Sequence, residues 1–221
     1  DIYRSVDGGN TWTKLLTQFM QDLTVNPNNL NHIFVAGYDS SAAMALFKSL
    51  DAGSNWTTHR VGPTNSVGYS VAIDPGNDNM IYLGGAKNSS QAALFKSLNG
   101  GSSWAEITGS ITGSIQCAVV DPTAPQRVYV GTSNGFFKSE NAGASWTKKS
   151  DKPVTCIKIN TSDPKEVFFG GSSGVFRSLD YGNTWADFNS GLGVTNIFCL
   201  AFNATNKILY AGTYYGGIYQ N

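Results

Sequence analysis

The chain has 221 residues, with 15 basic and 15 acidic side chains, and only 14% of its residues are charged. This balance argues against nucleic acids and anionic membrane surfaces as partners, because both attract clustered lysine and arginine. A 41% share of apolar residues is enough for a folded core. No run approaches the roughly 18 consecutive apolar residues of a membrane-spanning helix. Three cysteines are too few for a disulfide scaffold, and we expect one or two domains. Because no leader precedes Asp1, we expect a mature protein or an excerpt of one.

A repeat of about 40 to 50 residues organises the whole sequence. Each copy contains a segment of the form Ser-x-Asp/Asn-x-Gly-x-x-Trp, and the serines stand at 5, 49, 97, 139 and 178, spaced by 44, 48, 42 and 39 residues. All five tryptophans occupy the last position of this segment. A residue that recurs in this way serves the repeat and not one special site.

Two further patterns recur between these segments. One is an alternating run that ends in a turn, as in CAVVDP at 117–122, and the other is a short apolar run that ends in small residues, as in VYVGT at 128–132. A third run precedes each Ser-to-Trp segment, and a fourth opens at its tryptophan. We name these strands A, B, C and D in chain order. Four short antiparallel strands per unit, repeated five times without a helical period, predict a β-propeller.

The consensus Ser-x-Asp-x-Gly-x-Thr-Trp resembles the Asp-box, or BNR repeat. This repeat is found in sialidases, sortilin-type receptors, xyloglucan-cleaving hydrolases and propeller-type photosystem II assembly factors. The resemblance implies an all-β fold, a single domain over residues 1–221 forming a five-bladed β-propeller of four-stranded antiparallel blades. An excerpt of a larger propeller is the alternative. Because the family is functionally mixed, the resemblance implies the fold far better than the activity.

The residues of the Asp-box are typical of a tight turn, which here would close the C-to-D hairpin. Aspartate accepts backbone N–H groups, and the glycine supplies a positive φ. Two boxes carry asparagine, which makes the same turn but cannot act as a general acid or a strong calcium ligand. We therefore predict purely structural roles, with no metal and no cofactor, for Asp7, Trp12, Asp51, Trp56, Asn99, Trp104, Asn141, Trp146, Asp180 and Trp185. The three cysteines share one A-strand position and are predicted to ring the axis as free thiols: Cys117, Cys156 and Cys199.

Irregular sequence gathers on one predicted face. The A-to-B and C-to-D turns define a box face, whereas the B-to-C and D-to-A loops define a loop face on the other side. Binding residues on rigid scaffolds usually lie in variable loops. Aromatic and amide side chains there suit a peptide or a sugar. The ligand-binding candidates on the loop face are Phe19, Tyr38, His59, Arg60, Tyr69, Tyr214 and Tyr215.

Catalysis is not expected. Sialidases of this repeat family use three arginines for the substrate carboxylate, but only Arg60 lies in a loop here. A glycosidase needs two carboxylates beside the scissile bond, and the acids least explained by the repeat are Asp22, Asp39 and Asp151. The xyloglucan-cleaving enzymes build their cleft between two larger propellers. A glycoside hydrolase remnant therefore stays only as an alternative, beside lectin-like carbohydrate binding.

The strand count leaves one C strand too many, because DIYRS at 1–5 and GIYQN at 217–221 match the same repeat position. We expect the N- and C-terminal strands to close the last blade within one chain. The alternatives are pairing with a neighbouring molecule, which describes a self-assembling extracellular subunit, and an excerpt from a longer array.

The sequence thus predicts a non-catalytic binding or assembly scaffold for a protein or glycan ligand. Its polar, weakly charged surface predicts an extracellular or secreted location, with the periplasm or another exported compartment as the variant. Four glycosylation motifs agree with export: those at Asn55, Asn88, Asn160 and Asn203.

Overall fold

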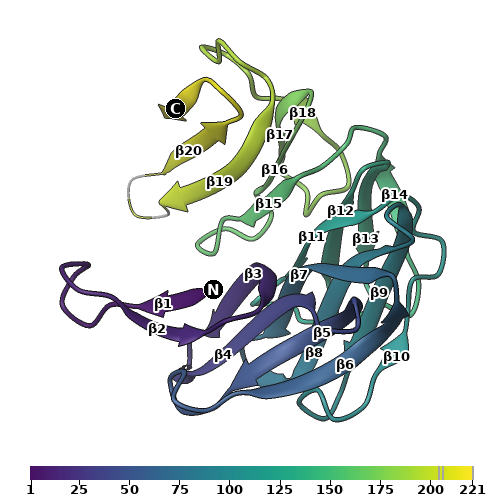
Figure 1. Ribbon diagram of the computed structural model, residues 1–221. Coiled ribbons are helices and arrows are strands. Elements are labelled where there is room, and N and C mark those ends of the chain that lie inside the picture. Colours follow the sequence, from purple (N-terminus) through teal and green to yellow (C-terminus); the bar gives the residue numbers. More distant parts are fainter. Residues whose placement is uncertain (204, 206, 221) are drawn as a thin grey trace.

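The computed structural model describes residues 1–203, 205 and 207–220, and its regular elements there are all β-strands (Figure 1). A two-stranded N-terminal hairpin is followed by four four-stranded sheets and a three-stranded C-terminal sheet. The hairpin comprises β1 (Ile2–Arg4) and β2 (Thr13–Leu16). The C-terminal sheet comprises β19 (Ile197–Asn203), β20 (Ile208–Thr213) and β21 (Gly217–Gln220). No helix that could cross a membrane occurs among these residues.

The four-stranded sheets, here called blades 1 to 4, each pair their strands antiparallel in chain order. Blade 1 is β3 (Phe19–Asn26), β4 (Asn29–Tyr38), β5 (Ala43–Ser49) and β6 (Thr57–Thr64). Blade 2 is β7 (Ser66–Asp74), β8 (Asn77–Lys87), β9 (Gln91–Ser97) and β10 (Ala105–Glu106). Blade 3 is β11 (Ile115–Val120), β12 (Val128–Thr132), β13 (Gly135–Ser139) and β14 (Thr147–Ser150). Blade 4 is β15 (Cys156–Ile159), β16 (Val167–Gly171), β17 (Gly174–Ser178) and β18 (Ala186–Asp187). The predicted all-β architecture of four-stranded antiparallel blades is confirmed.

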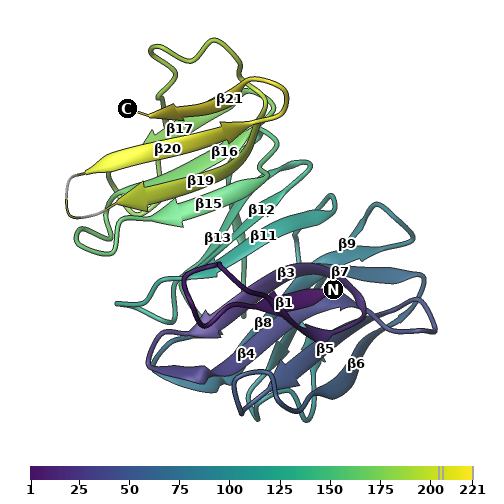
Figure 2. The same cartoon turned by 60° about the vertical axis from the view of Figure 1, so that its left-hand side comes forward.

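The A strands lie innermost, and each contacts the A strand of the next sheet (Figures 1 and 2). Hydrogen bonds join the first of these strands: the Asp22 carboxylate accepts the Val71 N–H at 2.9 Å, and the Ser70 hydroxyl accepts the Ala118 N–H at 3.0 Å. Asp22, Ser70 and the cysteines share this repeat position. Its side chain lies between two neighbouring inner strands, and this explains why the position takes small side chains.

Apolar cores fill the space between successive sheets. Phe34 and Leu83 belong to the core between blades 1 and 2, and Tyr129 and Phe169 to the core between blades 3 and 4. Strand β12 is buried at every residue because it has sheet neighbours at both edges and packed side chains on both faces. The B-strand motif is therefore continuously apolar and does not alternate.

Small residues end the B strands because the neighbouring A-strand backbone approaches closely. A Cβ on Gly37 would lie 2.0 Å from the Phe19 carbonyl oxygen, and one on Gly85 would lie 1.9 Å from that of Val67. Any side chain there would push the two strands apart. This close approach lies next to a β-bulge in each A strand.

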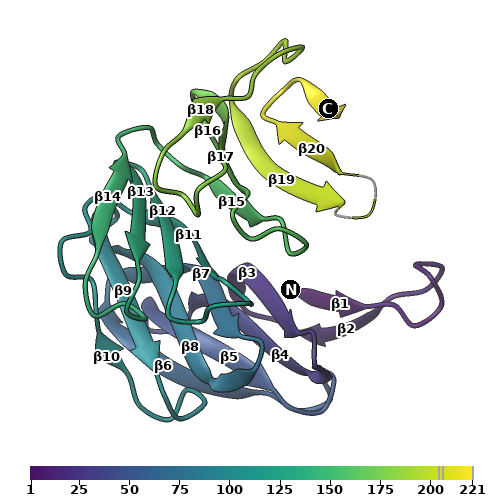
Figure 3. The ribbon, with the colours of Figure 1, turned by 180° about the vertical axis from the view of Figure 1, so that it is seen from behind.

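The ring is open in this structure. The N-terminal hairpin and the C-terminal sheet stand at the two ends of an arc and form separate sheets (Figures 1 and 3). The expected closure of the last blade by both termini is thus not formed, and five closed blades stay a prediction. Two contacts explain this correction. β21 takes the edge of β20 through a short local turn, and Arg4 holds β1 against blade 1 by donating to the Ala52 carbonyl.

Candidate binding site on the loop face

The Asp-boxes are C-to-D turns held by hydrogen bonds within the box. In the second box, the Ser49 hydroxyl accepts the Gly53 N–H at 2.8 Å and donates to Asp51 at 2.9 Å. Asp51 in turn accepts the Asn55 N–H at 2.8 Å. The hydrogen bonds from Asn55, and then that from Ser49, lower the pKa of Asp51 to about 2. The sequence analysis assigned no role to this serine, so its contacts were missed.

The asparagine boxes make the same turn with one hydrogen bond reversed. Asn99 accepts the Ser103 N–H at 2.8 Å, and its amide donates to the Ser103 hydroxyl at 2.8 Å. In the first box, by contrast, the Thr11 hydroxyl donates to Asp7. The turn is therefore built with or without an ionised group at this position, as a structural role requires.

Phe19 and Tyr38 form a stacked pair on the loop face. They are register partners at the start of β3 and the end of β4, and their rings lie 4.8 Å apart at 8°. Asp39 follows Tyr38 directly and accepts the Arg60 Nε at 3.0 Å. The structure thus stacks two of the predicted residues, Phe19 and Tyr38, and pairs a third, Arg60, with the residue that follows Tyr38.

Burial raises the pKa of Asp39, but hydrogen bonds from Ser41 and Arg60 and from two backbone N–H groups outweigh it and bring the pKa to about 2. Asp151 pairs with Lys148 at 2.5 Å, and this lysine lowers its pKa too. Asp22 accepts backbone N–H groups, as described above. Each of the three acids considered for hydrolysis is therefore engaged by a hydrogen bond or an ion pair within the fold.

A second aromatic group lies on the C-terminal sheet. The Tyr214 ring contacts Phe198 at a centroid distance of 5.9 Å and Tyr215 at 4.9 Å, both edge to face. Tyr215 is 99% exposed and has a φ of 109°, which is unusual for a residue with a Cβ. Together with exposed Ile218 these residues form the aromatic patch, which borders a pocket of about 450 Å³.

The patch includes a residue that sequence reasoning missed. Phe198 is the extra residue of a β-bulge between Ile197 and Cys199, and a bulge commonly re-aims a side chain. The signal was an aromatic residue directly before the shared cysteine position. Tyr69 occupies the equivalent bulge in β7 and is half-buried.

His59 lies away from the loop-face groups. Its Nε2 is 3.1 Å from the Thr57 hydroxyl, and its ring lies beside Gly101 of the third box. Burial, and then the nearby Lys48, lower its pKa. His59 therefore packs between blades. Among the described residues no group of three or more His, Cys, Asp or Glu side chains is placed to hold a metal ion, and the three cysteines are free thiols.

The sheets, boxes and axial strands together define an Asp-box β-propeller. The family described as "Sortilin, neurotensin receptor 3" (Sortilin-Vps10) matches residues 1–134, which is more than half of the chain. The protein belongs to this Asp-box propeller family. Among curated proteins, a search found no match.

Solved structures with the same fold include enzymes and a peptide-bound protein. An ancestral GH74 enzyme is 23% identical with a TM-score of 0.69, over 87% of this chain and 27% of its own. The GH74 enzyme of Niastella koreensis is 19% identical with a TM-score of 0.63, over 99% and 48%. A structure described as YCF48 bound to D1 peptide is 14% identical with a TM-score of 0.67, over 92% and 63%. The chain thus spans less than half of these GH74 proteins.

Proposed function

We propose that this protein is a non-catalytic module that binds an extended polypeptide segment through the aromatic patch. The observation that carries the proposal is the exposure of four large apolar side chains, Phe198, Tyr214, Tyr215 and Ile218, of which all but Tyr215 line one pocket. Exposed apolar groups that gather in this way mark interaction sites. Tyrosine and phenylalanine supply large, stiff contact surfaces for a partner's side chains.

A peptide fits the patch better than a sugar does. The three rings meet edge to face, so they offer a cleft and not a flat platform. Ile218 adds an aliphatic wall. That YCF48 has been seen with a peptide supports peptide binding as a use of this fold.

The low pKa values of Asp39 and Asp151 support a role without catalysis. A glycosidase needs a general acid that stays protonated near neutral pH, and such a group has a raised pKa. Asp39 has a pKa of about 2, so it is ionised there. Neither acid is suited to protonate a leaving group.

The test begins with selection of peptides from a random phage-displayed library on the full chain. The Phe198→Ala/Tyr214→Ala variant should bind the selected peptide at least about tenfold more weakly, since interface aromatics often contribute 2 kcal/mol or more. Leu30→Ala, which removes an exposed apolar side chain on another strand, should bind like the wild type. Equal affinity of the double variant, or no peptide selected above background, would contradict the proposal.

Glycan binding at the Phe19–Tyr38 pair is the second candidate. Here the rings are parallel, as suits a sugar ring, and Tyr38 is followed directly by Asp39, which pairs with Arg60. A glycan array probed with the wild type and Phe19→Ala distinguishes this site. Signals lost in Phe19→Ala but kept in Phe198→Ala/Tyr214→Ala would favour it.

We also propose an exported location, supported by the weakly charged surface and the position of one glycosylation motif. Asn88 is exposed in a turn, whereas Asn160 is buried and donates to Glu166 at 2.7 Å. Expression through a eukaryotic secretory pathway should yield folded protein with a glycan at Asn88 and none at Asn160. Retention in the cell, or a glycan at Asn160, would count against export.

A further inference from the structure

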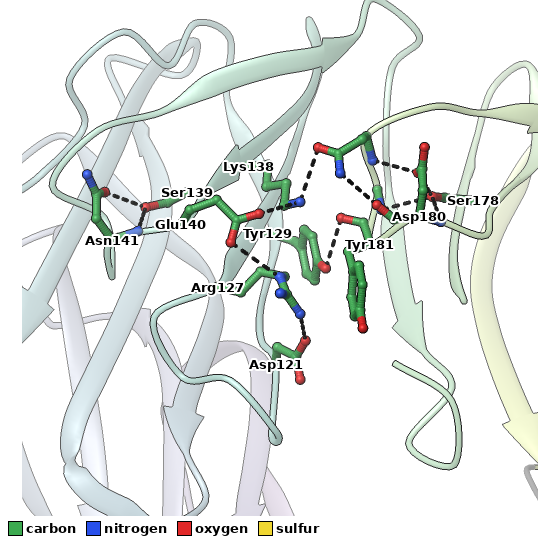
Figure 4. Close-up of polar contacts among 12 residues, drawn as sticks. Asp121, Arg127, Tyr129, Lys138, Ser139, Glu140, Asn141, Ser178, Asp180 and Tyr181 are labelled. Atoms are coloured by element: carbon green, nitrogen blue, oxygen red, sulfur yellow. Dashed lines mark hydrogen bonds and ion pairs between the residues drawn. The ribbon is translucent and has the colours of Figure 1, made fainter. Parts of the chain in front are cut away.

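The amine of Lys138 lies buried at the junction of blades 3 and 4, between two side chains of different chemistry (Figure 4). Its side chain is only 2% exposed, and its Nζ is 2.5 Å from Glu140 Oε1. The same Nζ donates to the carboxamide oxygen of Asn183 at 3.2 Å. Asn183 belongs to the fifth box (Ser178–Trp185), which is the C-to-D turn of blade 4. One buried amine thus has a carboxylate and a carboxamide as partners.

The lysines at the same repeat position in blades 1 and 2 have different partners. Lys48 donates to the Gly100 carbonyl at 2.9 Å, and Lys96 donates to the Ala142 carbonyl at 2.8 Å. A contact with the backbone of the next box is therefore enough for the structural role of this position. The carboxamide beside Lys138 goes beyond what the repeat requires.

Both side-chain partners of Lys138 are departures from the repeat. At the position of Glu140 the other four boxes carry aliphatic residues: Val6, Leu50, Leu98 and Leu179. At the position of Asn183 the second, third and fourth boxes carry Ser54, Ser102 and Ala144. Two unusual residues, 43 positions apart by subtraction of their numbers, meet at one lysine. Such a meeting is expected where the lysine has a chemical role of its own.

The fifth box holds the Asn183 carboxamide in one orientation. Its Nδ2 donates to the Asp180 carbonyl at 2.7 Å, while its Oδ1 accepts from Lys138. Since Cγ is bonded to that oxygen, the electrophilic carbon of the carboxamide lies next to the amine. Asn183 is also exposed, so a leaving ammonia has a path to solvent.

Glu140 is placed to take a proton from the lysine. Burial raises the pKa of Glu140, but the hydrogen bond and charge of Lys138, and then the charge of Arg127, outweigh it and lower the pKa. The carboxylate is therefore ionised near neutral pH and can act as a base. Arg127 Nε lies 3.4 Å from its second oxygen, and the guanidinium also stacks on the Tyr181 ring of the fifth box at 4.1 Å.

We propose that Lys138 and Asn183 form an isopeptide bond that joins blade 3 covalently to the box of blade 4. Glu140 takes one proton from the Lys138 ammonium, and the neutral amine attacks the Asn183 Cγ. The Nζ–Cγ bond forms and the Cγ–Nδ2 bond breaks. A second proton of the amine moves to the leaving nitrogen, which departs as ammonia and takes the proton from Glu140 to become ammonium. The carboxylate is thereby regenerated.

Two physical effects favour this reaction. The amine and the carboxamide belong to one folded chain and are already held within hydrogen-bond distance, and such positioning replaces a bimolecular encounter. The reaction also turns a buried ammonium into a neutral amide, and an interior charge is costly.

The intact mass of the folded chain tests the bond. By mass spectrometry the wild type should lie about 17 Da below the mass calculated from its sequence, because one ammonia is lost. Lys138→Arg keeps a cation but not the amine, and Asn183→Ser introduces the residue of the third box, so both should show their full calculated mass. Lys96→Arg is the matched control and should keep the loss. A wild type at its full calculated mass, or a loss kept in Lys138→Arg, overturns the proposal.

Tryptic peptides locate the bond. Residues 128–148, uncleaved after Lys138, should be joined to residues 178–207. The location matters because a succinimide at an Asn-Gly pair loses ammonia too, and Asn99 and Asn134 each precede a glycine. A loss found at either of these asparagines, with residues 128–148 and 178–207 unlinked, would contradict the proposal.

The rate of bond formation tests the base. Glu140→Gln keeps a hydrogen-bonding side chain without a proton acceptor of this kind, and should slow the mass loss about a hundredfold. The rate is followed by intact mass at intervals after cell-free synthesis. An unchanged rate would show that Glu140 does not take part in the reaction.

Discussion

In each of the five boxes the serine hydroxyl accepts the N–H of the glycine four residues later, at 2.7 to 2.8 Å. The same hydroxyl donates to the Asp or Asn two residues later. One oxygen thus fixes the glycine, with its positive φ, and the acceptor that closes the turn. The acid that gives the box its name is the more replaceable of the two.

Ser139→Ala should destabilise the protein by about 1–3 kcal/mol, because it leaves the buried Gly143 N–H without an acceptor. Ser5→Ala removes the same hydrogen bond in an exposed box, where water replaces it, and should cost less than about 1 kcal/mol. Urea unfolding of both variants measures the difference. Equal losses would show that the surrounding blade adds nothing to the box.

Asp51 makes part of the stability sensitive to acid. Its pKa falls from 3.8 to about 2 on folding, so its contribution is full above the ordinary pKa and is lost as the pH falls through about 2. Asp51→Asn should flatten the change in Tm over that range, whereas Asn99→Asp should steepen it. Melting curves between about pH 5 and about pH 2 test both. Parallel curves for the wild type and both variants would contradict this assignment.

Some strand side chains both pack in the interior and form hydrogen bonds to the next sheet. In β12 and β13, Tyr129 and Lys138 are buried, yet each carries its polar end to the box of the next blade. A buried lysine needs such partners, because an unpaired charge in the interior is costly. Contacts of this kind explain how neighbouring sheets keep one fixed relation although no strand is shared between them.

Tyr129→Phe should lower the free energy of unfolding by about 1 kcal/mol, because the Tyr181 carbonyl loses its donor between blades. Tyr210 holds the same repeat position in the C-terminal sheet, and no box lies against it among the residues that the structure describes. Tyr210→Phe is therefore the matched control and should leave stability unchanged within about 0.5 kcal/mol. A loss as large in the control would assign the effect to the sheet and not to the box.

At the scale of the whole molecule, the repeat predicted what depends on local pattern and missed what depends on pairing between distant segments. The four-strand unit follows from alternation, small residues and turns. The closure of the ring could not be predicted from this pattern, because Ile2–Arg4 and Ile218–Gln220 match the same repeat position. Of the two, Ile218–Gln220 is nearer to β20 in the chain and pairs with its edge. Loop closure favours a turn of three residues over a contact across the whole chain.

The loop-face site was partly predictable for the same reason. Phe19 and Tyr38 meet because β3 and β4 are neighbours in one blade, which the strand order already implied, whereas Arg60 on β6 reaches only Asp39, the residue after Tyr38. Phe198 was missed because a β-bulge turns it outward, and the alternation of apolar and polar residues does not predict a bulge. His59 was assigned to a loop but lies in β6, facing the next box. The contacts of Lys48 and Lys96 with the boxes of the next sheets were also missed, because their partners lie 52 and 46 residues ahead.

The three thiols differ in chemical reactivity along the arc. Cys117 and Cys156 are half-buried, each on an inner strand that contacts the inner strand of the next sheet, whereas Cys199 is exposed. Burial raises the pKa of Cys156 to about 11, so little thiolate forms there near neutral pH. Iodoacetamide should therefore alkylate Cys199 first, as mass spectrometry of tryptic peptides can show, and equal labelling of all three would contradict this order.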